Sequence, residues 1–326
     1  MRLLISVAVV HGGLALACGG ARPAANVAPP PVTPAPAARA SGEPSAAPAA
    51  PVSPDAGPAG VPATAPGRSC GALGCRAFAS PREAFEQALQ GVPRVIAVGE
   101  SHAQKAGAQV PSATQRFREQ LLPVLAGRAK GIVVELLLPD KRCQKQQVAD
   151  VAKRQEAVTA PQAETNQNEF VVLGQAAKAL GIVPQPLVPT CDELKTVLGA
   201  GSGDIDAMLR LVADITTRET SALLAAGDPE KSVVTYGGLV HNDLAPRPGR
   251  EAWSFGPRLA ERAGESFVEI DLIVPEFVRP EPPWTNLAWY PHYDAARDGA
   301  ETRLFEPTPR SFVLVFPRTP NENAPP

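Results

Sequence analysis

From about residue 80 onward, short hydrophobic runs alternate with longer segments of helical periodicity. Runs rich in β-branched residues are typical of buried strands, whereas apolar residues three and four positions apart predict amphipathic helices. The predicted strands cover residues 94–98, 131–136, 182–183, 231–236, 267–274 and 311–316, and the predicted helices cover 81–90, 113–127, 140–155, 167–180 and 204–226. This alternation predicts an α/β fold, a largely parallel or mixed sheet covered by helices on both faces.

The first 68 residues lack the alternation. Residues 1–18 hold Arg2, an apolar run and small residues before Cys18, a pattern typical of a signal peptide with a lipobox-like end. Residues 19–68 contain 13 Pro and 16 Ala but no aromatic residue, Leu or Ile, so they cannot bury enough apolar surface to fold. We predict a disordered Pro/Ala-rich tether followed by one domain, residues 69–326.

The same pattern predicts where the protein goes. Export followed by acylation of Cys18 would place it in the cell envelope, anchored by lipid to the outer membrane. Cleavage by an ordinary signal peptidase is the alternative, and it would release a soluble secreted protein. The formal net charge is −2, with 31 basic and 33 acidic side chains, so no global field favours nucleic acid as a partner.

Export changes the interpretation of the remaining cysteines. Cys70, Cys75, Cys143 and Cys191 form an even set, which in an oxidising compartment favours disulfides and allows three pairings. We favour Cys70 with Cys75 and Cys143 with Cys191. A structural zinc site is the rival interpretation, although the C-x4-C spacing has no neighbouring His.

Two G-x-x-H motifs carry the candidate chemistry. Gly99-Glu100-Ser101-His102 follows the first strand, and Gly238-Leu239-Val240-His241 follows a later one. Side chains just past the carboxyl ends of parallel strands meet at one edge of the sheet, and Glu135, at the end of another strand, should join them there. Two imidazoles and two carboxylates suit a divalent transition metal. Arg218, on the helix before the second motif, could supply charge for an oxyanion.

Each of these residues also has a structural interpretation. A Glu at a strand end is commonly solvated or ion-paired, and a lone His near a helix start is commonly a cap. We expect the glycines of the motifs to let the backbone turn sharply. We also expect Glu269 and Asp271 to face solvent or a helix end, and Asn242 to support His241.

These motifs also carry a family resemblance. The stretches V-I-A-V-G-E-S-H, V-V-E-L-L, T-R-E-T and V-V-T-Y-G-G-L-V-H-N-D resemble, in order and spacing, the superfamily of ChaN-like haem-binding lipoproteins, TraB and Tiki proteins and erythromycin esterases. The resemblance runs from about residue 80 to 275. It implies an α/β fold with a single site formed by Glu100, His102, Glu135, Arg218 and His241.

Three functions follow as expectations. The first is a hydrolase of peptide or ester bonds that depends on Mn, Co or Zn, with His102, His241 and Glu100 as ligands and Glu100 or Glu135 as general base. The second, from the ChaN branch, is a lipoprotein that holds haem or iron between protomers, without catalysis and as a homodimer. The third is a structural envelope lipoprotein.

Overall fold

A computed structural model describes residues 67–105 and 109–320. Nine strands form one mixed sheet in the order β1-β2-β8-β9-β7-β3-β6-β4-β5, and the predicted α/β fold is confirmed. The five strands from β7 to β5 are mutually parallel, while β8 runs antiparallel to both β2 and β9. The strands are β1 Arg68–Ser69, β2 Arg76–Phe78, β3 Val95–Glu100, β4 Ala129–Leu137, β5 Val183–Leu187, β6 Ser232–Gly238, β7 Phe267–Ile273, β8 Thr302–Thr308 and β9 Ser311–Val315.

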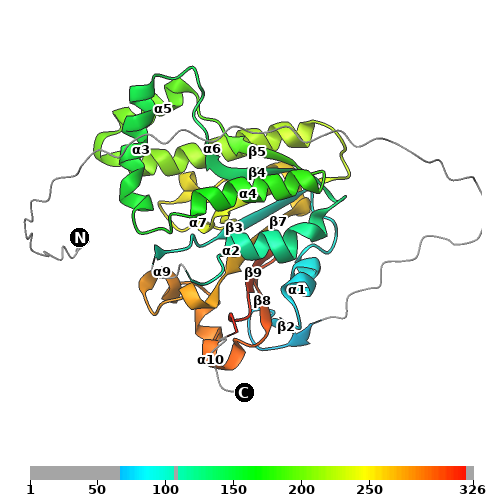
Figure 1. The fold of residues 1–326 in the computed structure, drawn as a ribbon. Helices are drawn as coiled ribbons and strands as arrows, with labels where there is room; N and C mark the ends of the chain where they lie inside the picture. Colours follow the sequence, from blue (N-terminus) through cyan, green and yellow to red (C-terminus); the bar gives the residue numbers. More distant parts are fainter. Residues whose placement is uncertain (1–66, 106–108, 321–326) are drawn as a thin grey trace, which may run out of the picture. The chain divides into compact units, whose positions relative to one another are not determined.

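Helices cover both faces of this sheet. Their bounds are α1 Pro81–Ala88, α2 Ala113–Arg116, α3 Lys145–Thr159, α4 Asn166–Ala179, α5 Cys191–Gly199, α6 Asp204–Ala225, α7 Leu239–Asn242, α8 Gly256–Ala263, α9 Pro282–Thr285 and α10 Ala295–Asp298. In Figure 1, α1, α2 and α4 lie in front of the strands. On the other face, α6 packs against β4, β5 and β6, and α8 packs against β3 and β7.

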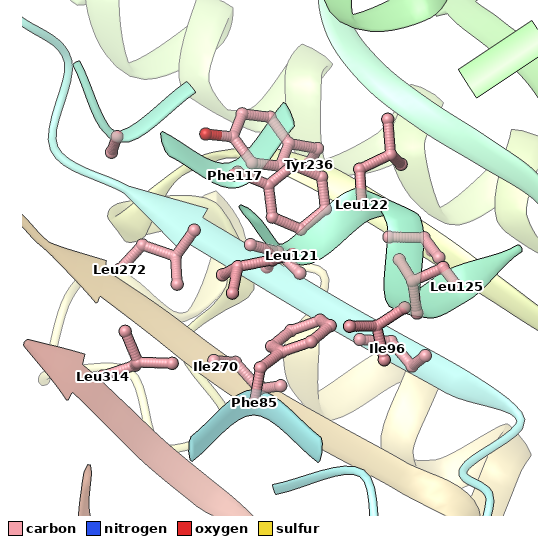
Figure 2. Packing of buried hydrophobic residues seen from close by; sticks show 14 of the residues in the cluster. Phe85, Ile96, Phe117, Leu121, Leu122, Leu125, Tyr236, Ile270, Leu272 and Leu314 are labelled. Carbon is pink, nitrogen blue, oxygen red and sulfur yellow. The ribbon is translucent and has the colours of Figure 1, made fainter. Parts of the chain in front are cut away.

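The larger core fills the space between the sheet and α1, α2 and α4. Phe85 of α1 lies over Ile96 and Ile270 of the sheet, and Phe117 packs against Tyr236 with ring centroids 4.7 Å apart (Figure 2). Each of these side chains is 2% exposed or less. Burying one such side chain contributes roughly 1.5–3 kcal/mol, so this face anchors the central strands that end at the two motifs.

Local sequence explains several helix boundaries. Ser80 caps α1 because its hydroxyl oxygen accepts a hydrogen bond from the Glu83 amide, 3.3 Å away, and Pro81 suits the first turn. A capping box between Thr190 and Glu193 starts α5. The T-x-x-E spacing was present in the sequence, yet α5 was not predicted.

The helix predicted at 113–127 is not continuous. The structure divides it into α2, a π-helical turn over Phe117–Leu121 and a 3₁₀ turn over Leu122–Leu125. Pro123 has no amide hydrogen for an α-helical bond, so the hydrogen-bond register changes around it.

Among the strands, the differences from the prediction lie at the edges of the sheet. The helices α8, α9 and α10 were also not predicted. β5 contains Pro184 and Pro186 and forms the sheet edge, where missing amide hydrogens are tolerated. β1, β2 and β8, which extend the opposite edge, were not predicted.

Both predicted disulfides are present. Cys70 pairs with Cys75, and Cys143 pairs with Cys191 across a sequence separation of 48 residues. The predicted signal peptide, Cys18 and nearly all of the predicted tether lie outside the described residues. Among the described helices, none is long and apolar enough to cross a membrane.

Candidate functional site

The two G-x-x-H motifs lie side by side because their strands are neighbours. β3 pairs with β6 in parallel, and the register places Gly99 beside Gly237 and Glu100 beside Gly238. Glu100, His102, Glu135 and His241 all line one cleft of about 630 Å³ at the carboxyl edge of these strands. The predicted convergence of these four side chains is therefore what the structure shows.

Glu100 and His102 form a hydrogen-bonded pair. His102 Nδ1 lies 2.6 Å from Glu100 Oε1. The Glu100 side chain is 2% exposed, and its second oxygen has no hydrogen-bond partner among the described residues. Burial lowers the pKa of His102, but the charge and hydrogen bond of Glu100, together with the charge of Glu135, outweigh it and raise this pKa to about 9. The pair therefore consists of an imidazolium and a carboxylate at neutral pH.

Glu135 lies between the two motifs. Its Oε2 accepts a hydrogen bond from the Gly238 amide at 2.6 Å, and its Oε1 is 3.6 Å from His241 Nε2. The first contact holds the carboxylate in place. The second is too long for a direct hydrogen bond, so Oε1 and Nε2 are two neighbouring polar atoms at the floor of the cleft.

His241 is buried, and its side chain is 3% exposed. Its Nδ1 lies 2.8 Å from the Trp253 carbonyl oxygen. A carbonyl oxygen can only accept, so Nδ1 carries a hydrogen, and in the neutral form of the ring Nε2 holds the lone pair that faces Glu135.

The glycines of the two motifs allow close packing. This corrects the prediction that they let the backbone turn sharply. Neither Gly99 nor Gly238 has a positive φ. A Cβ at Gly99 would lie 2.6 Å from Asn242 Cγ, and one at Gly238 would lie 3.2 Å from His102 Nε2. Each motif's glycine thus makes room for a side chain from the other motif's segment.

The structure does not bring Arg218 to this cleft. Its guanidinium donates to Glu193 Oε1 at 2.7 Å and to the Val188 carbonyl at 3.1 Å, and its side chain is 44% exposed. Arg218 also bonds to Glu219. Arg218 therefore bonds to residues in and next to α5, away from the cleft. This position does not support a role in stabilising an oxyanion.

Two acids of β7, Glu269 and Asp271, were expected to face solvent or a helix end, and both lie against the carboxyl end of α7 and the residues that follow it. Glu269 on β7 is 4% exposed, and its Oε2 accepts from the Leu244 amide at 3.1 Å. Asp271, two residues on, accepts from Asn242 Nδ2 at 3.0 Å. Asn242 thus fixes α7 to β3 and β7. Among the described residues its amide nitrogen bonds to Ala97 and Asp271 and not to the His241 ring, which corrects the expected support of that histidine.

The metal expectation finds limited support in the side-chain arrangement. No group of three or more His, Cys, Asp or Glu side chains within residues 67–105 and 109–320 is placed to hold a metal ion. His102 Nδ1 is engaged by Glu100 and His241 Nδ1 by Trp253. This arrangement of side chains is better suited to proton transfer to and from an organic substrate than to coordination of a metal ion.

Two walls of the cleft are apolar, whereas the segment from Thr159 to Gln167 lines it with mainly polar side chains. Phe170 of α4 stands on one side, 6.1 Å from the His102 ring between centroids. Met208, Leu209 and Val212 of α6, with Ala152 of α3, line another wall. A charged floor beneath apolar walls can bind an organic substrate and limit the access of water.

Comparisons with known proteins add little to this geometry. No protein-family model matches the chain, and no curated protein matches it. A solved structure titled "The structure of the type III effector HopBA1" is 11% identical, with a TM-score of 0.37, and the match covers 76% of this chain and 98% of that one. A likeness this weak carries no argument about function.

Proposed function

We propose that the protein is an exported hydrolase that cleaves esters by general acid–base catalysis in this cleft. The observation that carries the proposal is the opposite hydrogen bonding of its two histidines. His102 is paired with a carboxylate and is protonated, whereas His241 donates from Nδ1 to a carbonyl, so that in its neutral form the lone pair lies on Nε2. One acid and one base in the same cleft match the two proton transfers of hydrolysis.

The base acts first. A water that donates one hydrogen to His241 Nε2 and the other to Glu135 Oε1 would be held by both acceptors, which are 3.6 Å apart. His241 takes a proton as the water oxygen bonds to the substrate carbonyl carbon. The Gly238 hydrogen bond keeps Glu135 in place for this step.

The acid completes the reaction. His102 donates its Nε2 proton to the leaving alkoxide as the carbon–oxygen bond breaks, which yields a carboxylic acid and an alcohol. Glu100 stabilises the imidazolium before this transfer. Solvent then returns a proton to His102 and removes one from His241, so the two histidines regain their starting states.

Two disulfides support an oxidising location, and this agrees with the proposal of an envelope lipoprotein anchored at Cys18. The resemblance to the ChaN, Tiki and erythromycin esterase superfamily remains part of the proposal. It rests on the same motifs that form the cleft floor.

The test is hydrolysis of p-nitrophenyl butyrate and ethyl butyrate by the purified protein. His241→Gln and Glu135→Gln should reduce kcat on both esters by about 100-fold, the lower end of acid–base contributions. His102→Gln should reduce kcat more on ethyl butyrate than on p-nitrophenyl butyrate, because ethoxide needs a proton to leave and p-nitrophenolate does not. His292→Gln, an exposed histidine outside the cleft, is the control.

The pH profile supplies a second test. Activity on ethyl butyrate should fall as pH rises through about 9, because His102 then loses the proton it donates. Glu100→Gln should move this alkaline limb to lower pH. An unchanged limb in that variant would contradict the assigned pair.

A metal-assisted reaction is the second candidate. It is favoured by the unpaired buried Glu100 oxygen and by the short separation of His241 Nε2 and Glu135 Oε1. Loss of activity in a chelator, restored by Mn, Co or Zn, would favour it over the metal-free reaction. A Soret band in protein purified from haem-supplied cells, with no hydrolysis of either ester, would favour haem binding instead.

A further inference from the structure

We infer that Asp206 and Trp253 are positioning residues that hold His241 in the orientation of a base. Asp206 Oδ1 accepts a hydrogen bond from the Trp253 indole nitrogen at 2.6 Å. The Trp253 carbonyl in turn accepts from His241 Nδ1 at 2.8 Å. The catalytic part of this inference rests on the proposed function, whereas the orientation of His241 can be tested without it.

The first step concerns which nitrogen of His241 carries hydrogen. Without the Trp253 carbonyl, a neutral imidazole would exchange its hydrogen between Nδ1 and Nε2. With hydrogen on Nε2, the ring would donate to Glu135 and could not accept a proton from water. The carbonyl therefore selects the reactive form of His241.

The second step concerns what places that carbonyl. Trp253 ends a 3₁₀ turn, Glu251–Trp253, that packs against α6. After Trp253 the chain is fixed to α7, because the Phe255 amide and the Ser254 hydroxyl both donate to the His241 carbonyl, at 2.8 and 3.0 Å. Before Trp253, the indole bond to Asp206 ties the turn to the first turn of α6.

Asp206 is well suited to this role. Its hydrogen bonds to the Trp253 indole and to Arg210 lower the pKa of its carboxyl, so it accepts across the neutral range. Its side chain is 42% exposed and does not line the cleft. Substitution of Asp206 should therefore leave the fold intact, so that an effect on His241 can be distinguished from a loss of folding.

The experiment compares Asp206→Ala, Asp206→Asn and Trp253→Phe in the full-length protein. Asp206→Asn keeps an oxygen that can accept from the indole, whereas the other two variants lose the bond. Asp214→Ala is the matched control, because it removes another exposed acid of α6 that pairs with an arginine, Arg258. Surface pairs of this kind contribute little to stability.

The first readout is the imidazole ¹⁵N spectrum of His241, which reports the hydrogen position on the ring. Wild type, Asp206→Asn and Asp214→Ala should show hydrogen on Nδ1. Asp206→Ala and Trp253→Phe should show a mixture of both forms. Identical His241 spectra in all five proteins would overturn the inference.

The second readout is kinetic. On p-nitrophenyl butyrate, Asp206→Ala should lower kcat by roughly tenfold with KM within about twofold, since a misplaced base affects the reaction more than binding. Combining it with Trp253→Phe should add little further loss. If wild type hydrolyses no ester but the spectra change as expected, the positioning holds and the proposed function fails.

Discussion

Asp271 and Asn242 share a partly buried hydrogen bond near the two motifs, and the contribution of Asp271 to the stability of the fold depends on its protonation. Burial raises the pKa of Asp271 to about 7. Burial and the nearby Asp271 and Asp243 also raise the pKa of Glu269. A carboxyl whose folded-state pKa is raised stabilises the fold fully below its unfolded pKa of about 3.9, and this stabilisation is lost as pH rises through 7.

Asp271→Asn should therefore stabilise the protein at pH 8. Asparagine carries no charge and keeps an oxygen for the Asn242 amide. We expect the midpoint of thermal unfolding at pH 8 to rise by about 2–4 °C, as for a gain near 1 kcal/mol, with little change at pH 4. Scanning calorimetry at both pH values, with Asp214→Asn as control, tests this. An equal rise at both pH values would argue against titration of Asp271.

Gly99→Ala should destabilise the protein through Asn242. The new Cβ would lie 2.6 Å from Asn242 Cγ, and forced overpacking costs about 1–3 kcal/mol. Gly174→Ala in α4 is the control, because its Cβ would meet only Pro184 Cβ at 3.5 Å. In urea unfolding, Gly99→Ala combined with Asn242→Gly should lose less than the sum of the single losses. Additive losses would show that the contact is not responsible.

At the scale of elements, α3 packs mainly against α5 and α6. Ala152, Gln155 and Thr159 of α3 line the cleft. Its amino-terminal end is fixed by the Cys143–Cys191 disulfide, and Gln147 Nε2 donates to the Cys191 carbonyl at 2.5 Å. Figure 1 shows α3 and α5 next to each other.

Replacing Cys143 and Cys191 by Ala should weaken this wall. Opening a loop of this length costs about 4 kcal/mol in the chain-entropy account. KM for p-nitrophenyl butyrate should rise several-fold while kcat at saturation is retained, because the residues of the cleft floor lie on strands of the sheet or directly after them. The matched control replaces Cys70 and Cys75, which lie in a separate hydrophobic cluster near β8. Equal KM changes in both double variants would contradict a specific role for α3.

At the scale of the whole molecule, we propose that the segment before residue 67 decides where the domain is held. Lipid on the predicted Cys18 should carry the protein into the detergent phase of a phase-separation experiment. Cys18→Ala should leave it in the aqueous phase or uncleaved. Unchanged partitioning of this variant would reject lipidation and favour another means of attachment.

The sequence by itself determined the alternation of strands and helices and the meeting of Glu100, His102, Glu135 and His241. For the cysteines it favoured the pairing that the structure shows, without excluding the other two. These features depend on local periodicity, on the export pattern and on the rule that parallel strands end at one edge. The spacing of the glycines also located the two motifs. The predicted reason for these glycines, a sharp backbone turn, was wrong. Each glycine instead allows the close approach of a side chain that is distant in the sequence.

Only the tertiary structure decided the environment of each side chain. Arg218 was expected at the site but turns to Glu193 on α5, a helix that the sequence analysis missed. Glu269 was expected to face solvent or a helix end, and the segment after α7 covers it. Trp253 could not be linked to His241, because this contact is to a backbone carbonyl and carries no side-chain pattern. Periodicity predicts which face of an element is buried, whereas the packing of segments distant in sequence selects the partners that give each histidine its proton state.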